Sequence, residues 1–530
     1  MTDPARHPDR DRRHWLAQAA GAGLGGLTGI LLGGCAPAAP RGPRSSGADR
    51  FALGIASGSP QADRVVLWTR LSGPDLAEVV DVQWELALDE GFRQLAARGT
   101  EQARAADAHS VHAEPAGLAP GRWYWYRFTA LGERSAVGRT RTHPAPGTAP
   151  PLRCAIASCQ RWDHGHYAAW RHLAQAADRA GGELDLVLFL GDYIYEYGGF
   201  PGRVRQHTGG LCRTLDDYRA RYALYKSDAS LQAAHACCPW VTVWDDHEVD
   251  NDYAGLQEQW LNVDFAARRA AAYRAYWEHM PFPKSARPGR DGGMRIFGHG
   301  DWGSLARILT VDDRQYRDPQ ACPRPPRAGS TTVATRDCAT LDDPRRSLLG
   351  ADQEAWLARH WSSTHRWNLL AQQTLMAPMN WNDPASPEGP KVWTDGWDGY
   401  PQARRRLLDT LAQRHIPGAV VLGGDVHANY VADLHLDPAR PDSPIVASEF
   451  CGTSISSEGM AQSRLDAMRP HHPHLHHGRS DERGYVRLEF GPDTLQATLL
   501  KVQHPRRPDS AVGISARFAV DARQPGILPP

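Results

Sequence analysis

The sequence predicts an α/β protein that is preceded by a small all-β domain. Short aromatic-rich segments separated by turn residues fill residues 51–143, whereas strand and helix patterns alternate from residue 152 onwards. Three apolar runs in this second part have the composition of strands buried on both faces, namely residues 186–190, 241–244 and 419–422. At 530 residues, the chain is long enough for a large core and an accessory domain.

The first 35 residues indicate that the protein is exported. The string at residues 11–16 resembles a twin-arginine signal, and the Gly-rich stretch behind it is too weakly apolar for a good membrane-spanning helix. Residues 32–35 resemble a lipoprotein signal-peptidase box; the alternative is a plain cleaved signal in which Cys35 is incidental. Residues 36–50 have the composition of a flexible tether. We therefore expect a periplasmic or cell-surface protein that meets the twin-arginine export machinery and, if Cys35 is lipidated, is attached to a membrane.

Residues 51–143 are predicted to form a β-sandwich of immunoglobulin or fibronectin type. Strand character is clearest at residues 65–69, 82–88 and 123–128. No group of residues in this domain suggests catalytic chemistry. A linker rich in Pro and Gly, residues 143–151, separates it from the α/β part.

Residues 152–505 are predicted to form a catalytic domain, and residues 506–530 a C-terminal tail. The predicted strands are residues 153–158, 184–190, 239–244, 305–311, 367–371, 419–422 and an antiparallel hairpin of residues 485–490 and 494–502. The predicted helices are residues 167–180, 216–235, 263–279, 351–364 and 401–415. Residues 314–350 and 380–400 have the length of loops that cover active sites.

Charge and cysteine content narrow the classes of function. The formal net charge is zero, which argues against specific nucleic-acid binding because nucleic-acid-binding domains are usually basic. The chain has 9 cysteines, and an exported protein can form disulfides. Cys322 and Cys338 bracket a Pro- and Thr-rich loop and are candidates for a disulfide, while Cys212 could pair with Cys237 or Cys238. The sequence by itself leaves this connectivity open.

Ionisable residues follow each of the three buried strands. Asp192 comes after the first, the string Asp245-Asp246-His247-Glu248 after the second, and Asp425 with His427 after the third. Ligands of open α/β sheets bind beyond the carboxyl ends of the strands, so these residues are expected to share one site. Each group alone has a structural alternative, such as a turn, a helix start or a surface pair. Together they predict a pair of metal ions that support hydrolysis.

The individual side chains suggest separate tasks. Asp192 can bridge two cations, and the phenolate of Tyr195 suits a hard ion such as ferric iron. Asp246 can hold a second metal, with Asn251 and Asp252 as further oxygen ligands. His247 can donate a hydrogen bond to a phosphate oxygen or protonate a leaving oxygen.

Two further candidates follow the first strand of the α/β part. Cys159 is either a thiolate ligand or an ordinary buried or disulfide-linked cysteine. Arg161 is either a clamp for phosphate or a surface residue.

The chain resembles the alkaline phosphatase D (PhoD-like) family of binuclear metallophosphoesterases. The resemblance is carried by Ser-Cys-Gln at residues 158–160, Gly-Asp-x-x-Tyr at 191–195, Trp-Asp-Asp-His-Glu at 244–248 and Gly-Asp-Val-His at 424–427. Further matching strings lie at residues 51–60, 313–316 and 449–454, so the resemblance covers roughly residues 51–505. It implies a metallophosphoesterase-type sandwich of mixed β-sheets flanked by helices.

The resemblance also implies a binuclear or trinuclear site of Fe³⁺ and Ca²⁺. Cys159, Asp192 and Tyr195 would hold iron, while Asp246, Asp425 and Asn251 would serve calcium. His427 falls where related enzymes place a metal-ligand histidine.

The implied reaction is hydrolysis of phosphate mono- or diesters by a metal-activated hydroxide or oxo group, assisted by His247 and Arg161. Phosphate would be released outside the cytoplasm. A phospholipase-D-like or nuclease-like diesterase is the alternative enzyme. A non-catalytic surface binding module is the alternative of another class.

Overall fold

The computed structural model describes residues 49–529 except 179–183, 261–264, 384, 439 and 441. The predicted export signal, with Cys35, and nearly all of the predicted tether lie outside the described residues. No helix in the described part of the chain is both long and apolar enough to cross a membrane.

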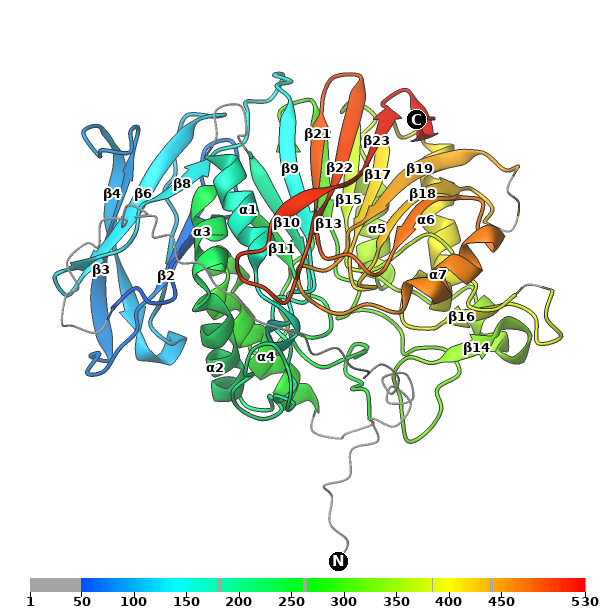
Figure 1. The fold of residues 1–530 in the computed structure, drawn as a ribbon. Coiled ribbons are helices and arrows are strands. Elements are labelled where there is room, and N and C mark those ends of the chain that lie inside the picture. The colour runs from blue at the N-terminus through cyan, green and yellow to red at the C-terminus, as the bar shows by residue number, and fades with distance from the viewer. Residues whose placement is uncertain are drawn as a thin grey trace, which may run out of the picture. The chain divides into compact units, whose positions relative to one another are not determined.

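Two mixed sheets form the centre of the fold (Figure 1). The larger has ten strands in the order β24 (Gln524–Ile527), β23 (Val512–Asp521), β22 (Thr494–Val502), β21 (Gly484–Phe490), β9 (Leu152–Ala157), β10 (Leu186–Leu190), β11 (Trp240–Val243), β1 (Ile55–Gly58), β2 (Val66–Arg70) and β5 (Ser110–Ala113). The smaller has seven in the order β12 (Gly298–Trp302), β13 (Ala306–Thr310), β15 (Trp367–Ala371), β17 (Ala419–Gly423), β19 (Ile445–Cys451), β18 (Asn429–His435) and β20 (Leu475–Arg479).

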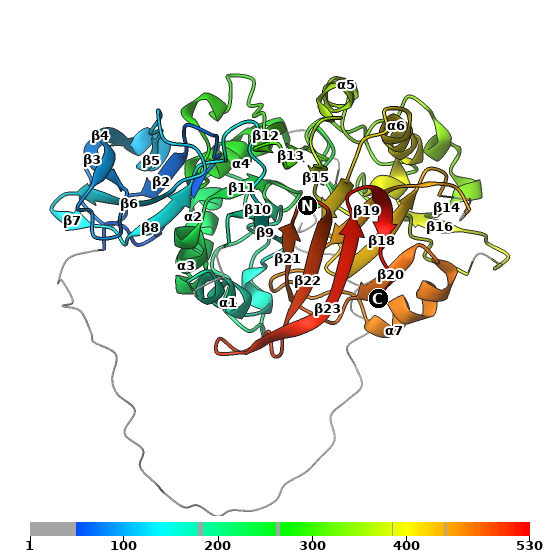
Figure 2. The same cartoon turned by 90° about the horizontal axis from the view of Figure 1, so that it is seen from above.

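Alternation of side chains along the strands explains how the two sheets pack. In β17, Val420 and Leu422 point into one apolar core and Val421 into the other. The first core contains residues of both sheets and of the helices α1 (Ala168–Ala177), α2 (Leu215–Lys226), α3 (Ala229–Cys237) and α4 (Phe265–His279). The second contains residues of α5 (Ala351–His360), α6 (Pro401–Gln413) and α7 (Gln462–Met468). The two groups of helices therefore flank a pair of sheets, as Figures 1 and 2 show.

The N-terminal region is all-β, as the sequence predicts, and it is joined to the α/β part through a shared sheet. A separate sheet contains β4 (Leu95–Arg104), β3 (Val79–Ala87), β6 (Trp123–Ala130), β7 (Glu133–Arg134) and β8 (Gly138–Arg141). It packs its apolar face on β1, β2 and β5, and these three strands belong to the ten-stranded sheet because β1 pairs in parallel with β11. The N-terminal region and the α/β part therefore share one sheet.

Two predictions of local structure are wrong. The predicted tail contains the strands β23 and β24, because apolar residues of β23, such as Ala516 and Phe518, pack against the core of the ten-stranded sheet. The helix predicted over residues 216–235 is interrupted, and Asp228 caps the start of α3 by accepting hydrogen bonds from the backbone N–H groups of Ser230 and Leu231.

The cysteines follow the prediction in part. Cys322 and Cys338 form a disulfide. Cys212, Cys237 and Cys238 are free thiols, and the Sγ atom of Cys237 lies 3.8 Å from that of its neighbour Cys238. Cys212 instead places its Sγ atom 3.7 Å from the carbonyl oxygen of Asp217.

The two predicted loops, residues 314–350 and 380–400, contact each other through a short β-sheet. Residues of the first form β14 (Thr332–Ala334), which pairs antiparallel with β16 (Lys391–Trp393) of the second. This small sheet holds both loops together beside the carboxyl ends of the central strands.

Candidate metal centre

The predicted site residues follow four strands that end close together. Cys159 follows β9, Asp192 follows β10, and Asp246 follows β11, three strands that run parallel and adjacent in the ten-stranded sheet. Asp425 and His427 follow β17 of the other sheet. The sequence predicts that strand ends share this site. The structure adds that these strands belong to two sheets.

The backbone leaves these strands in an uncommon conformation. Cys159, Asp192, Asp425 and His427 have φ angles of 57°, 61°, 63° and 53°, in the left-handed region that residues other than glycine rarely adopt. The preceding Gly191 has φ of 108°, and a Cβ atom there would lie 2.4 Å from the Cβ atom of Asp245. Such strained conformations persist only where the surrounding structure enforces them, and they cluster at functional sites.

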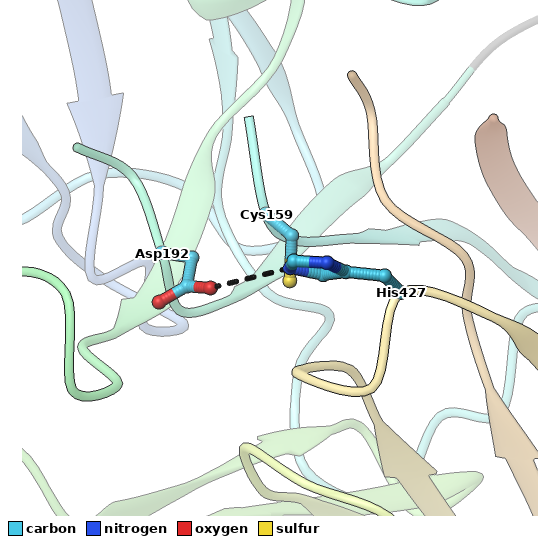
Figure 3. A group of neighbouring side chains, drawn as sticks. All are labelled: Cys159, Asp192 and His427. Atoms are coloured by element: carbon cyan, nitrogen blue, oxygen red, sulfur yellow. Dashed lines mark ion pairs between the residues drawn. The ribbon is translucent and has the colours of Figure 1, made fainter. Parts of the chain in front are cut away.

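Cys159, Asp192 and His427 form the first group of possible metal ligands. Their ligand atoms lie within 4.8 Å of one another, and the Oδ2 atom of Asp192 is 3.9 Å from Nε2 of His427 (Figure 3). The hydroxyl of Tyr195 donates to Asp192 Oδ2 at 2.8 Å and lies 3.1 Å from His427 Nε2. The structure therefore brings a thiol, a carboxylate, a phenol and an imidazole together.

Asp246 links this group to more carboxylates. Asp246 belongs to three groups whose ligand atoms lie within 4.8 Å of one another. Its partners are Asp192 and His247 in the first group, Asp245 and Asp425 in the second, and Asp252 and Asp395 in the third. Asp395 is not among the predicted residues, because the sequence predicts only a loop for residues 380–400; in the structure Asp395 follows the short strand β16. Asn251 donates its backbone N–H to Glu196 Oε1 at 2.9 Å, and its neighbour Asp252 joins the carboxylate group.

The protonation of these groups depends on burial. Burial is the largest cause that raises the pKa of the Cys159 thiol, the Tyr195 phenol and the Asp246 carboxyl well above their ordinary values. Burial likewise raises the pKa of Asp425 to about 6. A bound cation acts in the opposite direction, because it favours the deprotonated form of each ligand.

Buried carboxylate oxygen atoms without hydrogen-bond partners indicate that this centre can hold cations. Asp192 Oδ1, Asp245 Oδ2 and Asp246 Oδ1 are buried and accept no hydrogen bond. Leaving a buried carboxylate oxygen without a partner costs free energy, which a cation offsets. The mixed S, N and O donors around Asp192 suit a transition metal. The two groups that Asp246 forms with carboxylates alone offer the oxygen donors that suit calcium.

Arg314 neutralises part of this acidic cluster. Its guanidinium donates to Asp245 and to Asp395, and its Nη2 atom lies 3.6 Å from Asp425 Oδ1. The side chain is almost fully buried. The string at residues 313–316 contains this arginine, but only the fold shows which carboxylates it contacts.

His247 is held by two contacts. Its Nδ1 atom lies 2.7 Å from Glu196 Oε2, and its ring centroid lies 4.1 Å from that of Tyr195. Burial lowers the pKa of His247, but the carboxylates of Glu196, Asp246 and Asp192 outweigh burial and raise it to about 10. Glu196 directly follows Tyr195 in the sequence, yet nothing in the sequence indicates its contact with His247.

Arg161 is a buried residue beside the centre. Its Nε atom donates to Asp163 Oδ1 at 2.8 Å, and its guanidinium carbon lies 5.5 Å from the ring centroid of Tyr195. Its Nη2 atom is buried and has no hydrogen-bond partner. The alternative of a surface residue is therefore wrong.

Comparisons with known proteins agree with this architecture. The family model of the PhoD-like phosphatases matches residues 154–499, and that of their N-terminal domain matches residues 34–144. Alkaline phosphatase D of Bacillus subtilis (strain 168) is 43% identical over 500 residues, which cover 90% of this chain and 82% of the relative.

Solved structures give the same result. The structure of PhoD matches with a TM-score of 0.84 and 41% identity, covering 92% of this chain and 93% of the other. The purple acid phosphatase PPD1 from yellow lupin (Lupinus luteus) seeds has a similar fold, with a TM-score of 0.56 and 12% identity over 88% of this chain and 74% of the other. The strand-end motifs, the two-sheet fold and these matches together show that the chain belongs to the PhoD-like phosphatase family.

Proposed function

We propose that this protein is an exported, metal-dependent phosphatase that hydrolyses phosphate monoesters, diesters or both. The family and the relative named alkaline phosphatase D support the phosphatase activity. Metal dependence is supported by one observation above all, the buried oxygen atoms of Asp192, Asp245 and Asp246 that accept no hydrogen bond.

The ligand groups suggest how cations would be held. Cys159, Asp192, Tyr195 and His427 would hold ferric iron, and Asp246 and Asp425, with Asp252 and Asp395, would hold calcium. When bound, these cations would lower the pKa of a water molecule and neutralise charge on the phosphoryl group.

The chain's own residues bind and orient the ester. Arg161 has a free Nη2 donor beside Tyr195, which suits a non-bridging phosphate oxygen. His247 has its Nδ1 atom engaged by Glu196, which leaves Nε2 to donate a proton to the departing oxygen or to hold a phosphoryl oxygen.

Export and attachment are proposed from the leader sequence. The twin-arginine string and the box that ends at Cys35 support transport of a folded protein and its retention at a membrane. Fractionation of the native host tests this proposal, and a Cys35→Ser variant that still stays with the membrane would contradict the lipid anchor.

The substitution Asp192→Asn tests the metal assignment. We expect at least a 100-fold loss of activity on mono- and diesters and a loss of bound iron and calcium, because Asp192 belongs to two ligand groups. Elemental analysis and turnover are measured on protein exported by its native host. Asp301→Asn is the control, since Asp301 pairs with Arg307 away from the centre. Full turnover by Asp192→Asn would refute the assignment.

A further inference from the structure

We propose that Phe200, with Arg161 and Arg203, forms a subsite that binds a planar aromatic leaving group of the substrate. The proposal rests on the proposed function, because it concerns the part of the ester that departs from phosphorus. Phe200 lies in the segment between β10 and α2, eight residues after Asp192 in the sequence.

Phe200 is exposed although it lies beside the buried centre. Its exposed fraction is 43%, whereas that of Tyr195 is 1%. The guanidinium carbons of Arg161 and Arg203 each lie 5.9 Å from the centroid of the Phe200 ring. An exposed ring with two guanidinium groups nearby offers apolar surface against which another aromatic ring can pack.

Arg161 connects this ring to the metal centre. Its guanidinium carbon lies 5.5 Å from the ring centroid of Tyr195 and 5.7 Å from that of Tyr197. The hydroxyl of Tyr195 in turn donates to Asp192. Because Arg161 lies near the rings of both Tyr195 and Phe200, a group bound at Phe200 would lie next to the metal centre.

The charges around Phe200 favour an aromatic group over a second anion. Arg203 Nη1 pairs with Glu458 Oε2 at 3.1 Å, and Arg161 pairs with Asp163. Each arginine thus has its charge partly neutralised, while its guanidinium carbon stays 5.9 Å from the centroid of the Phe200 ring. The position of Glu458 is fixed as well, because its carbonyl oxygen lies 2.8 Å from Nδ1 of His427.

Kinetics with matched esters test the subsite. The metal-loaded protein is compared with Phe200→Ala and Phe200→Trp on 1-naphthyl phosphate and on an alkyl phosphate of equal charge. We expect Phe200→Ala to raise KM for the naphthyl ester about 2- to 10-fold, with KM for the alkyl ester unchanged. Phe200→Trp retains a ring and is expected to keep the preference. Leu131→Ala removes an exposed apolar side chain in the turn between β6 and β7 and is the control.

Binding of non-hydrolysable analogues tests the subsite even if the protein does not hydrolyse the esters. If the unchanged protein hydrolyses neither ester, the proposed function fails, and equilibrium binding of naphthyl and alkyl phosphonates still judges the subsite. Equal losses for both ligands in Phe200→Ala would overturn the subsite and assign Phe200 a structural role. Unchanged affinity for the naphthyl ligand would overturn it too.

Discussion

At the scale of single residues, the centre depends on side chains that hold other side chains. Glu196 is fully buried and uses both carboxylate oxygens, one toward His247 Nδ1 and one toward the backbone N–H of Asn251. It thereby fixes the ring of His247 beside Tyr195. A residue of this kind affects the reaction through the group that it orients.

Removal of Glu196 is expected to reduce turnover only while His247 is present. Glu196→Ala should lower kcat about 10- to 100-fold, because the imidazole loses the partner that orients it. In the His247→Ala background, the same substitution should change kcat less than about 2-fold, since coupled residues are not additive. Both comparisons are made at equal metal content.

The matched control is Glu278→Gln. Glu278 is also fully buried, but it accepts hydrogen bonds from Arg219 and Arg274 at the end of α4. We expect lower stability and unchanged kcat. Independent, additive effects of Glu196→Ala and His247→Ala would contradict the positioning role of Glu196.

At the scale of elements, the ends of the strands carry the chemistry. β10 and β11 run parallel and in register, so the turns that follow them lie against each other. Gly191 permits this contact because it has no Cβ atom and adopts a positive φ angle. The short loop after each strand thus places Asp192 and Asp246 in one group of possible metal ligands.

The substitution Gly191→Ala should move Asp192 out of its ligand group. The added methyl group would lie 2.4 Å from the Cβ atom of Asp245, so one strand end must shift. We expect lower iron and calcium content and at least a 10-fold loss of activity. Gly132→Ala is the control: its φ is also positive at 79°, but nothing lies within 4 Å of the added atom. Equal metal content in both variants would contradict the expectation.

At the scale of the whole molecule, the centre needs both sheets at a fixed distance. Asp192 and Asp246 follow strands of one sheet, and Asp425 follows a strand of the other. The C-terminal strand β24 ties the sheets together, since the backbone N–H of Ile527 donates to Asp433 Oδ1 at 2.8 Å and that of Gly526 to Ser448 Oγ at 3.2 Å. Asp433 and Ser448 belong to β18 and β19.

A chain truncated after residue 505 should lose both stability and metal. Without β23 and β24, the edge of β22 is exposed and the bonds to Asp433 and Ser448 are lost. We expect a lower thermal midpoint and, at equal temperature, less bound iron and calcium. Asp433→Ala removes one of these contacts and should have a smaller effect. A truncated protein with an unchanged midpoint would show that these strands are dispensable.

The sequence predicts strands and helices well where a strong local pattern exists. The alternation of strand and helix, the disulfide between Cys322 and Cys338 and the hairpin of β21 and β22 are all present in the structure. The predicted helix over residues 216–235 is wrong because one capping side chain, Asp228, outweighs the continuous pattern. The predicted tail is wrong because weakly apolar strands become stable only beside an existing sheet edge.

By itself, the sequence determined which residues can carry the chemistry. Motifs at strand ends name Cys159, Asp192, Asp246, Asp425 and His427; each alone has a structural alternative, but together they point to one site beyond the strand ends. Only the tertiary structure decided which partners surround them. Asp395, Arg314 and Glu196 reach the centre through contacts between segments far apart in the chain, and such contacts follow from the packing of two sheets rather than from any local pattern.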